Sequence, residues 1–180
     1  MEKDLLGRKI RKRRSKLEVD LERYDQNSFD ERLARLKWLV RVFPDRHSFA
    51  GPPETLFMFG EVKNTFVDGA YVATVLLCTS FIEHWLSSFL SSRGFDANAK
   101  GGLKAITKCL RRERLTHDFL IKRIDRLREL RNPFAHLKAF DHAYNLSQRS
   151  YAESLSPFVV MEEDAKFAVS LMYAVATKIN

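Results

Sequence analysis

Apolar positions recur at helical spacing along most of the chain and predict a series of helices. Residues 65–92 carry a nearly continuous apolar stretch, which predicts one long helix in the middle of a bundle. Gly94 is well placed to cap its C-terminal end. The same spacing predicts further helices at 103–112, 117–131 and 162–178. Residues 141–156 have weak periodicity and predict a surface loop, followed by a short extended piece at 157–161.

The N-terminal part of the chain divides into two predicted segments. Residues 1–24 predict a basic helix or arm. Residues 28–31, Ser-Phe-Asp-Glu, match a capping box, so a helix is expected from there to about Val42. The loop rich in proline, glycine and polar residues that follows completes a segment of residues 28–53. A helical domain over residues 54–180 then accounts for the rest of the chain.

Composition supports the helical prediction. The chain has 180 residues, of which 45% are hydrophobic, and it contains only 7 glycines and 5 prolines. Because β-sandwiches and barrels need many turns, the sequence predicts an all-α fold. We expect an up-and-down bundle of four to five helices, with an N-terminal basic helix or arm.

Several classes of protein are disfavoured by what the chain contains. No uninterrupted apolar run reaches the roughly 20 residues that span a bilayer, so no membrane association is expected. The two cysteines form no CxxC pair and predict reduced thiols in a cytoplasmic protein. The five histidines lack metal-ligand spacing and no glycine-rich phosphate loop is present, so we expect no metal and no cofactor.

The net charge of +8 is concentrated in two segments. Residues 1–24 hold nine Lys/Arg against five Asp/Glu, and residues 100–131 hold eleven against four. Such basic segments suit a polyanion such as nucleic acid, although a solvated basic surface explains them equally well. The candidate nucleic-acid-binding residues of the arm are Arg8, Lys9, Arg11, Lys12, Arg13, Arg14 and Lys16.

Arg131 occupies an unusual position in the helix predicted for residues 117–131. On a helical wheel it falls within the apolar stripe formed by Leu120, Ile124 and Leu127. A guanidinium there must be paired, or reach water at the helix end, or line a wet cleft. The first two alternatives are structural and the third is functional.

The residues after Arg131 favour the functional alternative. Asn132 followed by Pro133 is a favoured helix start, so one helix is expected to end near Arg131 and another to begin at Pro133. In an uninterrupted helix His136 would point away from Arg131, whereas the break lets the two side chains converge. Histidine moves protons near neutral pH and arginine holds phosphate, so the pair suits phosphodiester chemistry.

Residues 127–136, LRELRNPFAH, resemble the signature of the HEPN superfamily, in which an arginine and a polar residue precede a histidine that follows the arginine after four to six residues. The resemblance covers about residues 54–180 and implies a helical bundle that forms a homodimer. It further implies a metal-independent endoribonuclease, in which His136 acts as general acid/base, Arg131 contacts the scissile phosphate and Asn132 orients the pair. Members include toxins and antiviral defence effectors, so RNA and an antitoxin or defence-system partner are expected. Toxins silenced by a nucleotidyltransferase partner carry a tyrosine two residues after the histidine, where this chain has Lys138.

Glu83 is the accessory candidate, since it lies in a polar stripe near the end of the long apolar helix and could hold Arg131 in place. Emergence of that helix end into solvent explains the stripe equally well. Without metal ligands, the nucleophile of a ribonuclease would be the ribose 2′-hydroxyl of the substrate. The sequence therefore predicts a HEPN-type endoribonuclease, and the alternative is an inactive HEPN-type module that binds nucleic acid or a partner protein.

Overall fold

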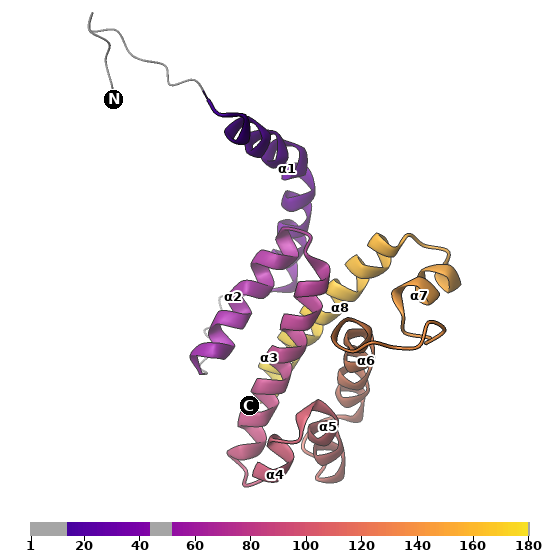
Figure 1. Ribbon diagram of the computed structural model, residues 1–180. Helices are drawn as coiled ribbons and strands as arrows, with labels where there is room; N and C mark the ends of the chain where they lie inside the picture. Colours follow the sequence, from indigo (N-terminus) through magenta and orange to yellow (C-terminus); the bar gives the residue numbers. More distant parts are fainter. Residues whose placement is uncertain (1–13, 44–51, 180) are drawn as a thin grey trace, which may run out of the picture.

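The computed structural model describes residues 14–43 and 52–179, and within them the chain forms eight α-helices and no β-strand (Figure 1). The helices are α1 (Lys16–Val42), α2 (Pro53–Val67), α3 (Tyr71–Ser91), α4 (Asp96–Ala99), α5 (Gly102–Arg112), α6 (Asp118–Ala135), α7 (Leu146–Glu153) and α8 (Pro157–Lys178). The predicted all-α fold is confirmed. Five of these helices, α1, α2, α3, α6 and α8, have 15 or more residues.

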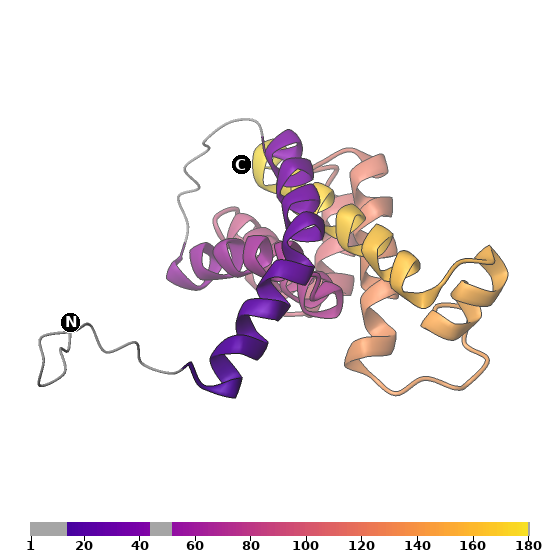
Figure 2. The same cartoon turned by 90° about the horizontal axis from the view of Figure 1, so that it is seen from above.

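Helix α3 is the centre of the fold. It contacts α2, α4, α5, α6 and α8, and α8 lies along it (Figures 1 and 2). Phe81, Ile82 and Leu86 of α3 are completely buried, and the indole N–H of Trp85 donates to the carbonyl of Ile179 at 2.8 Å. By length and composition alone α3 could also cross a membrane, and its place at the core accounts for the same apolar character.

The single long helix predicted for residues 65–92 is wrong, because the chain turns between α2 and α3. Gly69 adopts φ +77°, a left-handed conformation that ends the helix. The buried guanidinium of Arg35 lies against this turn and donates from Nε to the carbonyl of Val67 at 2.7 Å. A cation at the C-terminal end of α2 satisfies its last carbonyl and its dipole. The predicted cap at Gly94 is confirmed, since its φ is +81° and the next N–H donates to the carbonyl of Leu90.

Helix α1 is continuous, so the predicted helix start at Ser28 is wrong. The capping box forms instead at Ser15, whose hydroxyl accepts from the N–H of Glu18 while its own N–H donates to the Glu18 carboxylate at 2.6 Å. These hydrogen bonds hold the pKa of Glu18 below its ordinary value. Ser28 lies inside the helix and its hydroxyl donates to the carbonyl of Tyr24 at 2.9 Å. The first half of α1 projects away from the other helices (Figures 1 and 2), which leaves Leu17 80% exposed.

The C-terminal region contains more helix than predicted. The expected loop at 141–156 holds α7, and the expected extended piece at 157–161 is the first turn of α8, capped by the Ser156 hydroxyl. Helix α7 has no buried residue, and Arg149 instead attaches it to Asp164 of α8 by two hydrogen bonds of 2.5 and 2.7 Å. These bonds raise the pKa of Arg149. Helix α7 is thus held by this ion pair and by Leu146, which packs against the core, rather than by a continuous apolar stripe, and this explains its weak periodicity.

Candidate active site

Helix α6 carries the candidate residues and runs through Pro133 to Ala135. The predicted helix end near Arg131 and new start at Pro133 are therefore wrong. Proline has no N–H to donate to the carbonyl of Glu129, but it lies in the last turn, where this loss is least disruptive. Leu130 before it is buried and Phe134 after it packs against the core, so the tertiary contacts favour continuing the helix.

Arg131 and His136 nevertheless converge, because His136 leaves the helix. His136 is the C-cap of α6, with φ −144° and ψ 135°, which is extended backbone. Its N–H still donates to the carbonyl of Asn132 at 2.9 Å, while its ring turns back toward the last turn. Nη1 of Arg131 lies 3.3 Å from Nε2 of His136. The predicted juxtaposition is thus present, although it arises at the helix end rather than at a break.

Arginine has only donors, so a hydrogen bond between the two groups requires Nε2 of His136 as the acceptor, with the proton of the neutral imidazole on Nδ1. Arg131 is half-buried and His136 is exposed, so an arginine donor and a basic nitrogen face solvent together. This arrangement suits an anionic substrate that carries an ionisable hydroxyl.

Asn132 contacts the candidate pair through its backbone carbonyl rather than through its side chain. Its carbonyl accepts from His136, as described above, whereas its Nδ2 donates to Glu129 in a long hydrogen bond of 3.4 Å. Glu129 is in turn paired with Arg128 at 2.7 Å. The amide of Asn132 is therefore directed to its own helix in this chain, and not to the Arg131–His136 pair.

Glu83 is not joined to Arg131, and among the described residues no ion pair links the two. Its Oε1 lies instead near Gly102 at the start of α5, 3.7 Å from where a Cβ of that glycine would be. The serines of the same stripe attach α4, since Ser87 donates to the carbonyl of Ala99 at 2.9 Å and Ser91 donates to Asp96. The polar stripe of α3 thus serves mainly to fix the short helix α4.

The chain leaving His136 presents large apolar side chains to solvent. Leu137 and Phe140 are 102% and 84% exposed. Their loop is held in place by Asn145, whose Nδ2 donates to the carbonyls of Ala139 and Phe140 at 2.7 and 3.1 Å. Exposed apolar residues on a fixed loop beside a polar pair are typical of a surface that another molecule covers.

Helices α5 and α6 form a hairpin that supports the site. Arg111 of α5 bonds to Asp118 and Asp125 of α6 at 3.3 and 3.1 Å, and these partners raise its pKa. Thr107 donates to Asp125 at 3.0 Å. These contacts fix the two helices antiparallel to each other. Leu120, Ile124 and Leu127 are buried in the hydrophobic core, as predicted.

The other sequence candidates lie apart from this pair. Arg8, Lys9, Arg11, Lys12 and Arg13 lie outside the described residues. Arg14 forms an ion pair with Glu22, and Lys16 is exposed at the start of α1. Within residues 14–43 and 52–179, no cluster of three or more His, Cys, Asp and Glu residues could hold a metal ion. Cys78 and Cys109 are buried free thiols, and burial raises the pKa of each.

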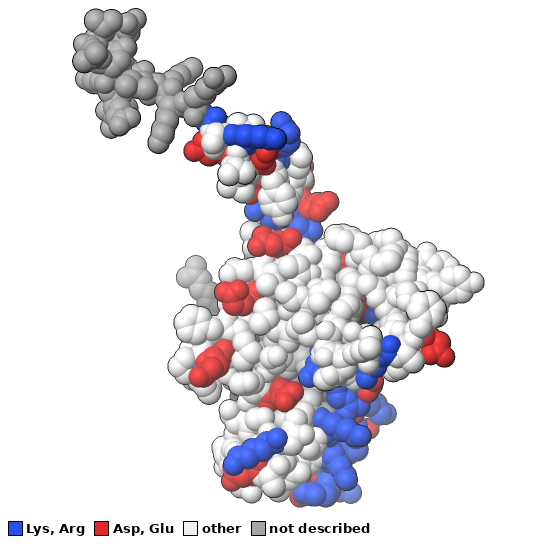
Figure 3. Space-filling model, viewed as in Figure 1, with Lys and Arg blue, Asp and Glu red and all other residues white. Residues whose placement is uncertain are grey.

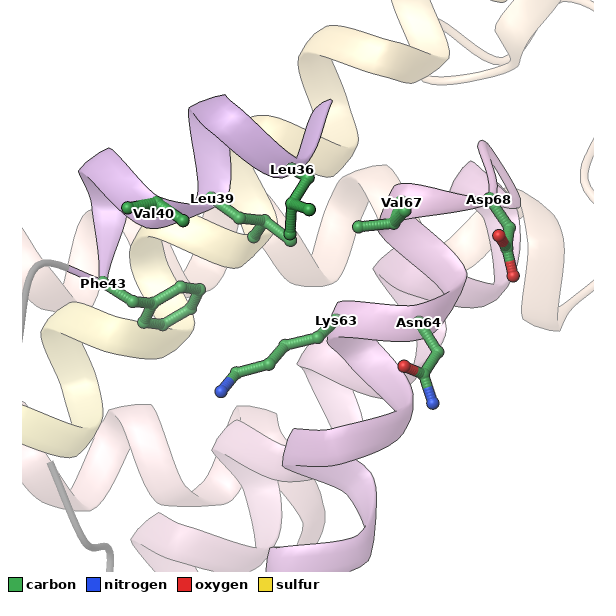
Figure 4. A pocket seen from close by; sticks show the side chains of 8 residues that line it. All are labelled: Leu36, Leu39, Val40, Phe43, Lys63, Asn64, Val67 and Asp68. Carbon is green, nitrogen blue, oxygen red and sulfur yellow. The ribbon is translucent and has the colours of Figure 1, made fainter. Parts of the chain in front are cut away.

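A pocket between α1 and α2 belongs to another part of the molecule (Figure 4). Leu36 and Val40 of α1 and its C-cap Phe43 line one side, and Lys63 and Asn64 of α2 line the other. Half of the residues that line the pocket are aliphatic, and Lys63 and Asp68 are the charged residues in it. None of the candidate site residues that the structure describes lines it.

Comparisons of the chain with protein-family models, with curated proteins and with solved structures gave no match. The candidate site therefore rests on the residues and geometry described above.

Proposed function

We propose that the chain is a HEPN-type, metal-independent endoribonuclease, with Arg131 and His136 as its catalytic residues. The observation that carries the proposal is the 3.3 Å contact between Nη1 of Arg131 and Nε2 of His136 at the exposed end of α6. The contact supports roles for His136 as a general base and for Arg131 as the group that binds the phosphate, acting together on one phosphodiester. The resemblance of residues 127–136 to the HEPN signature points the same way.

The chemistry follows from these two groups. Nε2 of His136 takes the proton of a ribose 2′-hydroxyl, and the 2′-oxygen forms a bond to the adjacent phosphorus. The bond from phosphorus to the 5′-oxygen breaks, and that oxygen takes a proton. The products are a 2′,3′-cyclic phosphate and a 5′-hydroxyl. Arg131 exchanges its imidazole acceptor for the phosphate oxygens and stabilises the charge that develops there.

A homodimer would complete the site. Leu137 and Phe140 lie next to His136 and are almost entirely exposed, so a second copy of the chain is a suitable cover for them. Around a two-fold axis, two histidines would share one cleft. The neutral form of one would act as base, while the protonated form of the other would supply the proton that the leaving oxygen needs.

The biological setting that we propose is a cytoplasmic toxin or antiviral defence effector, controlled by an antitoxin or another defence-system partner. Lys138 replaces the tyrosine of toxins that are silenced by a nucleotidyltransferase. We therefore propose control by a different kind of partner.

The decisive experiment measures RNA cleavage and the chemistry of the new ends. Cleavage should persist in EDTA, should leave 2′,3′-cyclic phosphate, and should stop when a 2′-O-methyl group is placed at the cut. His136→Ala should lower the rate by about 10²- to 10⁴-fold, the usual contribution of a general base. His84→Ala, an exposed histidine of α3, is the matched control and should cleave at the wild-type rate. A requirement for Mg²⁺, or products ending in 3′-hydroxyl, would refute the proposal.

The competing function is a HEPN-type module that binds nucleic acid or a protein without cutting. One observation favours it, namely the bond from the Asn132 side chain to Glu129 rather than to the catalytic pair. RNA binding by wild-type protein without any cleavage, in the experiment above, would select this alternative.

A further inference from the structure

The outward face of α5 is made entirely of basic and small side chains. Lys104, Lys108, Arg111 and Arg112 project on one side, whereas Leu103, Ile106 and Leu110 of the other side are buried. The helix contains no acidic residue. Figure 3 shows basic side chains gathered over this part of the molecule; helix α1 carries further basic side chains, and the rest of the view is mainly uncharged with scattered acidic residues.

These basic residues differ in whether they already have partners. Arg111 is committed to Asp118 and Asp125, and Arg112 is paired with Glu113 at 2.5 Å. Lys104 and Lys108 are exposed and form no ion pair with any described residue. They lie one turn apart, so two uncompensated ammonium groups stand about 6 Å apart along the helix axis. Unpaired charges in a row attract a polyanion.

The face is close to the candidate active site. Because Thr107 bonds to Asp125 while Arg111 bonds to Asp118, the middle of α5 lies beside the middle of α6. Asp125 precedes Arg131 by six residues, or about 9 Å along α6. A strand that crosses α5 can therefore continue to the pair of Arg131 and His136.

The buried side of α5 indicates which polyanion fits. An amphipathic helix that binds a lipid surface inserts an apolar face into it. In α5 that face is committed to the core, and none of the exposed large hydrophobic residues lies on this helix. The exposed face offers only charges, which suits the phosphate backbone of a nucleic acid.

We propose that Lys104 and Lys108 bind phosphates of the RNA backbone beside the bond that is cut. The choice of RNA rests on the proposed ribonuclease function. The contacts are to phosphate only, so they add affinity without reading sequence. Since stacked RNA advances about 3.4 Å per nucleotide and α5 is about 16 Å long, the face covers roughly five nucleotides.

The test measures binding of a 20-nucleotide RNA to the full chain that carries His136→Ala, so that the RNA stays intact. In this background Lys104→Gln/Lys108→Gln should make the slope of log affinity against log salt shallower by about 1.4, because each of the two lost phosphate contacts to a single strand contributes roughly 0.7. At 0.1 M salt that slope corresponds to a loss of about 25-fold. The matched control is Lys37→Gln/Lys178→Gln, which removes the same charge from exposed lysines of α1 and α8.

A second measurement uses chain with intact His136. The α5 double variant should raise KM for the 20-nucleotide RNA and leave kcat unchanged, because its lysines do not contact the reacting atoms. A dinucleotide, which cannot span from His136 to α5, should be cleaved by this variant at the wild-type rate.

The outcomes separate the two proposals. An unchanged affinity and salt slope, or an equal loss in the control, overturns the inference even if RNA is cut. The inference is also overturned if the chain binds phosphatidylserine vesicles through these lysines and does not bind RNA. RNA binding that depends on α5 without any cleavage supports the inference and refutes the ribonuclease proposal instead.

Discussion

The sharpest contrast available in α6 is between a residue that stabilises the fold and a residue that we propose to be catalytic. Leu127 is completely buried and lies one turn before Arg131. Leu127→Ala removes three carbons from the core and should cost about 3 kcal/mol, within the usual 2–5 kcal/mol for such a truncation. Arg131→Ala removes one 3.3 Å hydrogen bond to an exposed imidazole, which is worth about 1 kcal/mol or less.

Urea denaturation followed by circular dichroism measures both effects. With a slope of about 2 kcal/mol per molar urea, Leu127→Ala should lower the midpoint by about 1.5 M and Arg131→Ala by less than about 0.5 M. Cleavage should show the opposite order, since Arg131→Ala abolishes it while Leu127→Ala retains it below the unfolding transition. If Arg131→Ala unfolds the protein as much as Leu127→Ala does, and His136→Ala still cleaves RNA, Arg131 is structural and the catalytic assignment is wrong.

Three further predictions concern other parts of the chain. Replacing the four basic residues at positions 8, 9, 11 and 12 with glutamine should make the slope of log RNA affinity against log salt shallower by up to about 2.8. An unchanged slope would mean that these residues do not bind RNA phosphates and form only a solvated surface. Asp164→Ala leaves the guanidinium of Arg149 without its two short hydrogen bonds, so the free energy of unfolding should fall by about 3 kcal/mol and limited proteolysis within residues 137–156 should accelerate. The neighbouring Glu163→Ala is the control and should do neither. Burial raises the pKa of Cys78, so above about pH 8.5 the unfolded chain loses a thiol proton that the folded chain keeps. The free energy of unfolding should therefore decline at alkaline pH. A decline that is no smaller in Cys78→Ala would contradict this assignment.

Periodicity alone predicted the helices whose inner face is apolar. Leu120, Ile124 and Leu127 recur at three- and four-residue spacing and all three are buried, so the orientation of α6 was predictable from the sequence. The placement of Arg131 at the end of that stripe followed from the same spacing. The charge count singled out residues 100–131, which contain α5, but a count alone does not show that Lys104 and Lys108 lie opposite Leu103 and Ile106.

Local signals failed where tertiary contacts compete with them. Ser15 and Ser28 both begin a Ser-x-x-Glu pattern, and only the first forms a capping box, because the chain around Ser28 continues a helix that packs further on. Pro133 normally favours a helix boundary, but here the helix continues and Phe134 in its last turn packs against the core. Gly69 ends α2 with the help of Arg35, which lies 34 residues earlier in sequence and is invisible to any local rule.

The position of Arg131 explains how one helix can serve both the core and the site. A guanidinium at the level of Leu127 would be buried without a partner, at a cost that the fold could not recover. One turn later the same face of α6 reaches the edge of the core, where Arg131 is half-buried and its stem covers apolar surface while its head meets His136. His136 can meet it only because the backbone becomes extended at that residue, since five residues of continued helix would separate the two side chains by about 140°. The apolar face of α6 that buries Leu127 therefore reaches solvent at the end of the helix, and there it exposes the guanidinium of Arg131, which we propose binds a phosphate.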